Sequence, residues 1–245
     1  MHWMPALDIT LAWALVIALM GGLVRGTTGF GAAMVMTPPL ALLLGPRVAV
    51  PVTLLLETFA ALSMLPAAAR IASWRVIGPI GAAAVLAVPL GGWLLAVADA
   101  LTLRRLIAGT VVLFSLALLS GLRYQGRQRL GTSLALGTLS GAMLGATSIG
   151  GPPVILYLLS GPDPAAVTRA NLSLYLVLIS AAGLVMLAAT GVLTVATGYT
   201  ALLLAPAFVL GVLAGTRLFS RFSDQRFRQL TMLLMCGVAL GVLLV

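Results

Sequence analysis

The sequence carries very little charge. Only 8% of its 245 residues are charged and none of them is a lysine, whereas about a quarter of the residues in an ordinary soluble domain are charged. Hydrophobic residues make up 61% of the chain. These proportions exclude a water-soluble protein and indicate a chain that lies in a lipid bilayer. Because a helix needs about 20 apolar residues to cross a bilayer, the length leaves almost no room for a separate soluble domain.

The residue types that perform most enzymatic chemistry are also nearly absent. The chain has one cysteine, Cys236, and one histidine, His2. A lone cysteine excludes a disulfide framework and a Cys-x-x-Cys metal site. A lone histidine next to the N-terminus excludes an intramembrane Ser–His dyad and a His-Glu-x-x-His zinc site. We therefore expect no enzymatic activity, no cofactor and no metal site.

Arginine supplies all of the positive side-chain charge. The 14 arginines and five acidic residues give a net charge of +9, which in a soluble protein would suggest a nucleic-acid partner. Here the arginines lie singly or in small clusters between apolar stretches, so membrane topology and anionic lipid headgroups explain them better. We expect the lipid bilayer, and not a nucleic acid, to surround this chain.

Ten hydrophobic stretches predict an all-α polytopic membrane protein with about eight to ten helical segments. They are Ala6–Val24, Gly29–Gly45, Val48–Ala68, Val76–Val97, Leu106–Leu122, Leu130–Ala146, Pro152–Ser160, Asn171–Thr190, Ala196–Gly215 and Leu230–Val245. The seventh stretch is too short to cross a ~30 Å hydrocarbon core as a helix. The polar connections between the stretches are too short to form a further domain.

The arginines also bear on topology. If all ten segments cross, eleven arginines fall on one side, namely Arg25, Arg70, Arg75, Arg123, Arg127, Arg129, Arg169, Arg217, Arg221, Arg226 and Arg228, and three on the other, namely Arg47, Arg104 and Arg105. If the second and seventh segments enter and return on one side, the division is nine to five. Positive residues concentrate on the cytoplasmic side, so the ten-crossing count fits better. It places both termini away from the cytoplasm.

An internal repeat is visible at a shift of 119 residues. The shift aligns Gly22 with Gly141, Gly26 with Gly145, Thr28 with Thr147 and Gly31 with Gly150. It divides the chain into residues 1–123 and 124–245, two repeats of one membrane domain. Each repeat holds five segments, an odd number, so the two would have opposite orientations, as in many secondary transporters.

The centre of each repeat is rich in glycine and proline. It reads RGTTGFGAAMVMTPPL over Arg25–Leu40 and GATSIGGPPVILYLL over Gly145–Leu159. Such clusters disfavour a continuous helix, so we expect each to be a hairpin with a helix end, an irregular turn and a new helix start. Irregular backbone is tolerated at membrane depth only where it is buried in protein or lines a cavity. This favours a substrate site, with close glycine-mediated helix packing as the alternative.

These stretches resemble those of the TauE/SafE (TSUP) family of sulfite and sulfoacetate exporters. The similarity rests on GTTGFGAAMVMTPPLALLLGPRVAV in the first half and GATSIGGPPVILYLLSGPDPAAVTRANL in the second. It covers essentially the whole chain. The resemblance implies a multi-pass carrier of the bacterial inner membrane that moves small sulfur-containing or carboxylate anions.

Glu57 is the acidic residue that lies deepest in an apolar segment. As the tenth residue of Val48–Ala68, it lies about 14 Å along the predicted helix, near the bilayer midplane. A buried carboxylate must be protonated, paired or wetted by a cavity. We interpret Glu57 as a proton-coupling or gating group, with a structural hydrogen-bonding role as the alternative.

Two arginines flank the hairpins. Arg25 precedes the turn of the first and Arg169 follows the second, and a guanidinium fork suits an oxyanion. Topological anchoring is the alternative for both. Asn171 is a weaker candidate, because an Asn at a helix start is more often an N-cap.

An anion that enters a membrane must exchange its water shell for fixed donors, and helix N-termini supply free N–H groups. We therefore predict that the two hairpins converge on one central anion site. Its expected residues are Arg25, Thr28, Gly29, Phe30, Gly31, Thr147, Ser148, Gly150, Gly151, Arg169 and Asn171, with Glu57 as the proton-coupling group.

These features predict a secondary transporter that exports a small anion by alternating access, with proton coupling as an option. The expected substrate is sulfite, sulfoacetate or a related organosulfur or carboxylate anion. Two alternatives stay open: an uptake permease for a similar compound, and a non-transporting membrane assembly subunit whose glycines serve only packing. The sequence leaves open the substrate, the direction, the coupling ion, the oligomeric state, and whether the second and seventh segments cross or re-enter.

Overall fold

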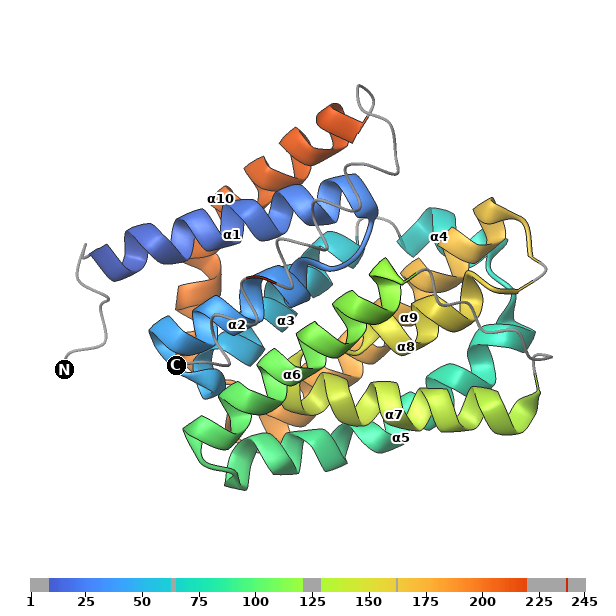
Figure 1. Ribbon diagram of the computed structural model, residues 1–245, viewed down its shortest axis with the longest axis horizontal. Helices are drawn as coiled ribbons and strands as arrows, with labels where there is room; N and C mark the ends of the chain where they lie inside the picture. Colours follow the sequence, from blue (N-terminus) through green and yellow to red (C-terminus); the bar gives the residue numbers. More distant parts are fainter. Residues whose placement is uncertain (1–8, 63–64, 121–128, 162, 220–236, 238–245) are drawn as a thin grey trace.

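The computed structural model describes residues 9–62, 65–120, 129–161, 163–219 and 237 (Figure 1). Over these residues the protein is helical and contains no β-strand. The helices are α1 (Ile9–Thr28), α2 (Ala32–Leu44), α3 (Pro46–Leu62), α4 (Leu65–Ile71), α5 (Trp74–Val97), α6 (Ala100–Leu119), α7 (Leu130–Thr147), α8 (Gly151–Leu158), α9 (Ala165–Ala189) and α10 (Val195–Phe219). The all-α architecture expected from the hydrophobic pattern is confirmed.

Five helices, α1, α5, α6, α9 and α10, are long and apolar enough to cross a membrane, as a polytopic membrane protein requires. The second and seventh expected segments are helices of only 13 and 8 residues, α2 and α8. At 1.5 Å per residue they rise about 20 Å and about 12 Å, less than a ~30 Å hydrocarbon core. Both helices are thus too short to span the core alone, and the choice between crossing and re-entry for these two segments stays a prediction.

Two other expected segments are described only in part. The stretch Val48–Ala68 is covered by α3 and α4 on either side of residues 63–64, which lie outside the described residues. The tenth stretch, Leu230–Val245, lies outside the described residues apart from Gly237.

Each short helix folds back against the helix before it. α2 runs antiparallel to α1, and Met36 fills the space beside Gly21, where a Cβ atom would lie 2.2 Å from the Met36 Cγ atom. α8 runs antiparallel to α7, and the hydroxyls of Ser133 and Tyr157 are hydrogen-bonded at 2.9 Å. These two antiparallel pairs are the hairpins that the glycine-rich stretches predict.

The first hairpin turns at its glycines and not at its prolines. Gly29 and Gly31 have φ angles of 79° and 87°, a left-handed conformation that glycine adopts without steric cost, and α2 starts directly after Gly31. The expectation that Pro38 and Pro39 help to break the helix is wrong, because both lie inside α2. Proline is tolerated in membrane helices where neighbouring groups satisfy the freed carbonyls.

Glycines also bring two pairs of parallel helices into close contact, α1 with α10 and α5 with α7 (Figure 1). A Cβ atom at Gly22 would lie 2.1 Å from the Phe208 carbonyl oxygen of α10, and one at Gly141 would lie 2.0 Å from the Ala84 carbonyl oxygen of α5. These glycines therefore serve close helix packing. Gly22 and Gly141 are 119 residues apart, so their equivalent packing supports the inverted repeat, which stays a prediction.

Polar contacts mark one end of the bundle, here called the Asp99 end. Arg47, in the first turn of α3, donates hydrogen bonds to the carbonyls of Leu95 and Ala96 at the end of α5. Asp99 caps α6 by accepting a hydrogen bond from the Thr102 N–H at 2.8 Å. Hydrogen bonds from the Thr102 hydroxyl and N–H hold the pKa of Asp99 below its usual value.

The opposite end, here called the Arg75 end, holds the start of α5, the start of α7 and the start of α9. The side-chain oxygen of Asn171 on α9 accepts a hydrogen bond from the N–H of Ser73, the N-cap of α5, at 2.7 Å. Arg75 lies in the first turn of α5, and Arg129 is the N-cap of α7. The Asn171 side chain thus ties α9 to the start of α5.

Candidate functional site

The turns of the two hairpins meet inside the bundle. The Thr37 hydroxyl of α2 and the Ser148 hydroxyl at the end of α7 are hydrogen-bonded at 2.8 Å, although 111 residues separate them in the sequence. A cavity lies beside this contact. It is lined by Arg25, Phe30, Gly31, Ala33, Met34, Glu57, Leu144, Ser148, Ile149, Gly150, Gly151, Pro152, Ile155 and Leu176. Seven of the expected site residues therefore lie around one space: Arg25, Phe30, Gly31, Glu57, Ser148, Gly150 and Gly151.

The side chain of Glu57, a residue of α3, lies at the N-terminus of α2. Its carboxylate accepts a hydrogen bond from the N–H of Ala33 at 3.0 Å, and its side chain is 8% exposed. The dipole of α2 favours a negative charge at this position. The prediction of free N–H groups at the start of α2 is therefore wrong for Ala33, because a carboxylate of the protein itself already holds this donor.

Arg25 supplies the positive charge of the cavity. It lies in the last turn of α1, is 5% exposed, and lines the cavity together with Glu57. Its charge acts through space on the Glu57 carboxylate. Within the described residues, the guanidinium donates no hydrogen bond to any acceptor. A buried guanidinium has five N–H donors and is costly to bury without partners, so its donors are available to water or an anion in the cavity.

The start of α8 adds backbone donors. α8 begins at Gly151, directly after Gly150, as the sequence predicts. Pro152 and Pro153 have no N–H, so the donors at this helix start are the N–H groups of Gly150 and Gly151. Neither of them donates a hydrogen bond to a described residue. A Cβ atom at Gly150 would lie 2.9 Å from the Ser140 carbonyl oxygen, so this close approach of backbone requires glycine.

A comparison with protein families identifies the class of protein. The family model described as "Sulfite exporter TauE/SafE" matches residues 14–242. The chain belongs to the TauE/SafE family. Comparisons with curated proteins and with solved structures give no match. The resemblance carried by the two glycine-rich stretches is confirmed, and it makes this chain a member of a family of membrane transporters for sulfur anions.

In this TauE/SafE protein the two predicted threonines stabilise the hairpin turns. The Thr28 hydroxyl donates to the carbonyl four residues earlier and accepts the Phe30 N–H at 3.3 Å. The Thr147 hydroxyl does the same with the Ile149 N–H at 3.2 Å. Neither threonine lines the cavity. Their hydroxyl groups are thus engaged in equivalent turns and do not face a ligand.

The other three predicted residues also lie apart from the cavity lining. Gly29 is exposed in the first turn, and a side chain there would meet open space. Asn171 is buried at the Arg75 end, where it holds the N–H of Ser73 and not the start of its own helix. Arg169 belongs to α9, and its side chain lies outside the described part of the chain.

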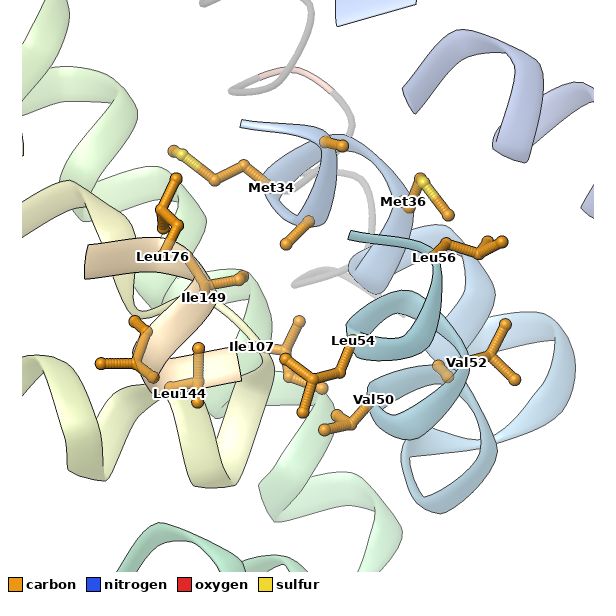
Figure 2. Close-up of a cluster of buried hydrophobic side chains, with 14 of the residues drawn as sticks. Met34, Met36, Val50, Val52, Leu54, Leu56, Ile107, Leu144, Ile149 and Leu176 are labelled. Carbon is orange, nitrogen blue, oxygen red and sulfur yellow. The ribbon is translucent and has the colours of Figure 1, made fainter. Parts of the chain in front are cut away.

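The sequence analysis missed the apolar wall of the cavity and the Thr37 contact. Figure 2 shows Met34 extending from α2 toward Ile149 and Leu176, with Leu144 on α7 beside them, and all four line the cavity. No local pattern separates these side chains from other core residues. Thr37 is likewise one threonine among several in the apolar stretches.

The shift of 119 residues is the signal that would have found part of this wall. It pairs ten of the lining residues: Arg25 with Leu144, Phe30 with Ile149, Gly31 with Gly150, Ala33 with Pro152 and Glu57 with Leu176. Each pair faces the same cavity from the two halves of the chain. The two charged members, Arg25 and Glu57, both come from the first half, and their partners are leucines. The two halves of this TauE/SafE protein therefore contribute equivalent positions to the cavity lining, but both charged side chains in the described lining come from the first half.

The cavity is small in this state. Its free volume is about 20 Å³, which accommodates one water molecule. A sulfur oxyanion, with several oxygen atoms around a central sulfur, is larger than this space. The hairpins must therefore move apart before such an anion fits between them.

Proposed function

We propose that this protein is a secondary transporter that exports a small sulfur-containing or carboxylate anion by alternating access, and that the hairpin cavity is its binding site. The observation that carries the proposal is Arg25, a buried guanidinium that has no hydrogen-bond partner in the described part of the chain and lines a cavity between the starts of α2 and α8. Family membership supports the transport class. The substrate and the direction of transport are the proposed part.

The physical basis is the replacement of an anion's water shell. A dehydrated anion needs donors fixed in place, and the cavity offers the Arg25 guanidinium and the unused N–H groups of Gly150 and Gly151. Charge-assisted hydrogen bonds to a guanidinium are the strongest of these. The dipole of α8 adds partial positive charge at its N-terminus. The apolar wall opposite these donors limits the site to a small ligand.

The two hairpins provide the moving parts in this proposal. The central cavity has room for about one water molecule, and the Thr37–Ser148 hydrogen bond joins the hairpins beside it. Opening toward either face would break this bond and widen the cavity. Two halves of opposite orientation, residues 1–123 and 124–245, would make the two openings equivalent movements.

Glu57 is the proposed coupling group. Its carboxylate takes a helix N-terminal N–H and lies in the field of Arg25, which are the interactions that a bound anion would make. Glu57 therefore competes with the substrate for the same interactions while it stays part of the chain; it is a tethered competitor of the substrate. Protonation removes its negative charge and weakens its hold on the Ala33 N–H, so that proton uptake favours anion binding. The anion then crosses together with a proton, and export in this scheme runs on an outward anion gradient that exceeds the inward proton gradient.

Counterflow tests the proposed function directly. Purified protein in liposomes loaded with unlabelled thiosulfate is expected to accumulate radiolabelled thiosulfate transiently, and parallel vesicles test sulfite, sulfoacetate and sulfate. Protein-free liposomes are the control. A membrane assembly subunit would give no counterflow with any of these anions, and this result would contradict the proposal.

The arginines support an orientation in a bacterial inner membrane. Arg70, Arg75, Arg129 and Arg217 lie toward the Arg75 end, and Arg47, Arg104 and Arg105 lie at the Asp99 end. If the segments follow one another in the predicted order, the remaining arginines between segments also belong to the Arg75 end. By the positive-inside rule the Arg75 end is then cytoplasmic.

Cysteine labelling checks this orientation in a Cys236→Ser background. Ala100→Cys, exposed at the Asp99 end, should react with a membrane-impermeant maleimide in spheroplasts. Arg70→Cys, exposed at the other end, should react only after permeabilisation. Ala100 is preferred to its neighbour Asp99, which caps α6. The reverse labelling pattern would place the Arg75 end outside the cell.

A further inference from the structure

A second cavity lies at the Arg75 end, separate from the hairpin cavity. Its free volume is about 180 Å³, and its polar lining consists of Arg75, Arg129, Ser133 and Tyr157. Ser133 lies 15 residues before Ser148 on the same helix, so the two cavities are about 22 Å apart along α7. No residue belongs to both linings. The volume accommodates a sulfate- or phosphate-sized group without any movement of the helices.

The charge of this cavity is positive and uncompensated. Among the described residues, Arg75 and Arg129 form no ion pair and no side-chain hydrogen bond, and no acidic residue is in the lining. Arg75 is in the first turn of α5 and Arg129 is the N-cap of α7. Two helix N-termini of 24 and 18 residues therefore add their dipoles to two guanidinium groups at one place.

Sidedness accounts for the sign of this charge but not for the cavity. The residues 119 positions from Arg75 and Arg129 are Thr194 and Thr10, and under the proposed inverted repeat they belong to the opposite, Asp99 end, where the positive-inside rule requires no cation. Arg70, also exposed at the Arg75 end, lies outside the cavity lining. It serves as a matched arginine with the same sidedness and no cavity.

We infer that this cavity is a second oxyanion-binding site, in which Arg75 and Arg129 hold the oxygens of a tetrahedral or pyramidal anion between the N-termini of α5 and α7. The same chemistry fits a free sulfur oxyanion or phosphate and the phosphate of an anionic lipid headgroup, since basic pockets between membrane helices bind both kinds of group. The site is occupied independently of the central cavity.

The second cavity is connected to the hairpin cavity through α7 and α8. The Ser133–Tyr157 hydrogen bond in its lining joins α7 to α8, and the same two helices end at Ser148, Gly150 and Gly151 in the central cavity. An anion on Arg129 therefore binds to the base of the hairpin whose tip lines the transport site. Under the proposed function, the second site is a place where anions gather before entry.

Trp74 provides a local signal for this site. It precedes Arg75 in the sequence and is 58% exposed. In the full chain with Trp3, Trp13 and Trp93 changed to Phe, its fluorescence is titrated in detergent with sodium sulfate, and separately with dioctanoyl phosphatidylglycerol or dioctanoyl phosphatidylcholine. This measurement reports binding at the Arg75 end without depending on transport, so it distinguishes failure of this inference from failure of the proposed function.

The expected result is a saturable change that Arg75→Gln and Arg129→Gln each weaken by about tenfold or more, as loss of a charge-assisted hydrogen bond predicts. Arg70→Gln and Arg25→Gln should leave the titration unchanged. Saturation by sulfate identifies a free-anion site. Saturation by phosphatidylglycerol alone, with the same dependence on arginine, identifies a lipid-phosphate site. Absence of saturation with every probe, or equal weakening by Arg70→Gln, would overturn the inference.

Discussion

Replacing Arg25 by glutamine is expected to weaken anion binding in the central cavity by roughly 10- to 100-fold. Arg25 is the one cation in the cavity lining, is 5% exposed, and has no hydrogen-bond partner among the described residues. A hydrogen bond to a charged group contributes about 1.5–3 kcal/mol, and every 1.4 kcal/mol is about tenfold in affinity. The measurement is anion affinity from counterflow or from thermal stabilisation of the purified protein.

Two further variants separate the charge from the shape of Arg25. Arg25→Lys keeps the positive charge but loses the planar fork of donors, so its affinity should lie between those of the wild-type protein and Arg25→Gln. Arg70→Gln removes an exposed arginine outside the cavity and should bind the anion normally. Equal affinity of Arg25→Gln and the wild-type protein would exclude Arg25 from the site.

A folding defect must be distinguished from a binding defect. Arg25→Gln leaves Glu57 without its nearby cation, and an uncompensated buried charge is strongly destabilising. The double variant Arg25→Gln with Glu57→Gln removes both charges and should recover thermal stability. If its anion affinity stays low while its stability recovers, the loss belongs to the missing guanidinium.

The helices were predictable because a bilayer demands long apolar segments. Lipid gives no hydrogen bonds to the backbone, so every spanning stretch is apolar and uninterrupted, as in α5 and α9. The limits of this signal are visible at α2 and α8. Their sequences are as apolar as those of the long helices, and only their length of 13 and 8 residues shows that they turn back inside the protein.

Proline was the misleading local signal. In solution Pro38 and Pro39 would end a helix, but in α2 they lie inside the helix and are mostly buried. The turn is instead set by Gly29 and Gly31, whose positive φ angles no other residue type adopts as readily. Backbone conformation, and not helix propensity, thus decides where the hairpin folds.

The site was predictable where its residues are neighbours in the sequence and not where packing brings distant helices together. Gly150 and Gly151 open a helix, which a local pattern indicates. The contacts of Ala33 with Glu57 and of Thr37 with Ser148 span 24 and 111 residues, so they depend on how the hairpins pack. Sequence reasoning therefore indicated the helix start at Gly150 and Gly151 but not the Glu57 carboxylate that holds the Ala33 N–H in the other hairpin.

Replacing Glu57 by glutamine is expected to abolish transport driven by a pH gradient while substrate exchange continues. Glutamine keeps an oxygen that accepts the Ala33 N–H hydrogen bond, which is 3.0 Å long in the described state, but it cannot take up or release a proton. Transport driven by ΔpH should fall at least tenfold, to the level of protein-free liposomes. The measurement is anion flux in proteoliposomes with an imposed pH gradient, compared with counterflow at equal pH.

Glu57→Asp is the matched control, because it keeps a titrating carboxylate on a shorter side chain. It should retain part of the pH-driven flux. If Glu57→Gln still drives the anion against its gradient in response to ΔpH, Glu57 is a structural hydrogen-bonding group and the coupling proposal fails.

The tethered-competitor role makes a separate demand on stability. In Glu57→Gln the buried Arg25 guanidinium loses its counter-charge, so the protein without ligand should melt at a lower temperature than the wild-type protein. A bound anion restores the missing negative charge, and a ligand that binds only the folded state stabilises it according to its affinity. The thermal stabilisation by a saturating anion should therefore be larger in Glu57→Gln than in the wild-type protein. An anion that binds away from Arg25 would give the first effect without the second, because it would not replace the missing charge, and this result would contradict the tethered-competitor role.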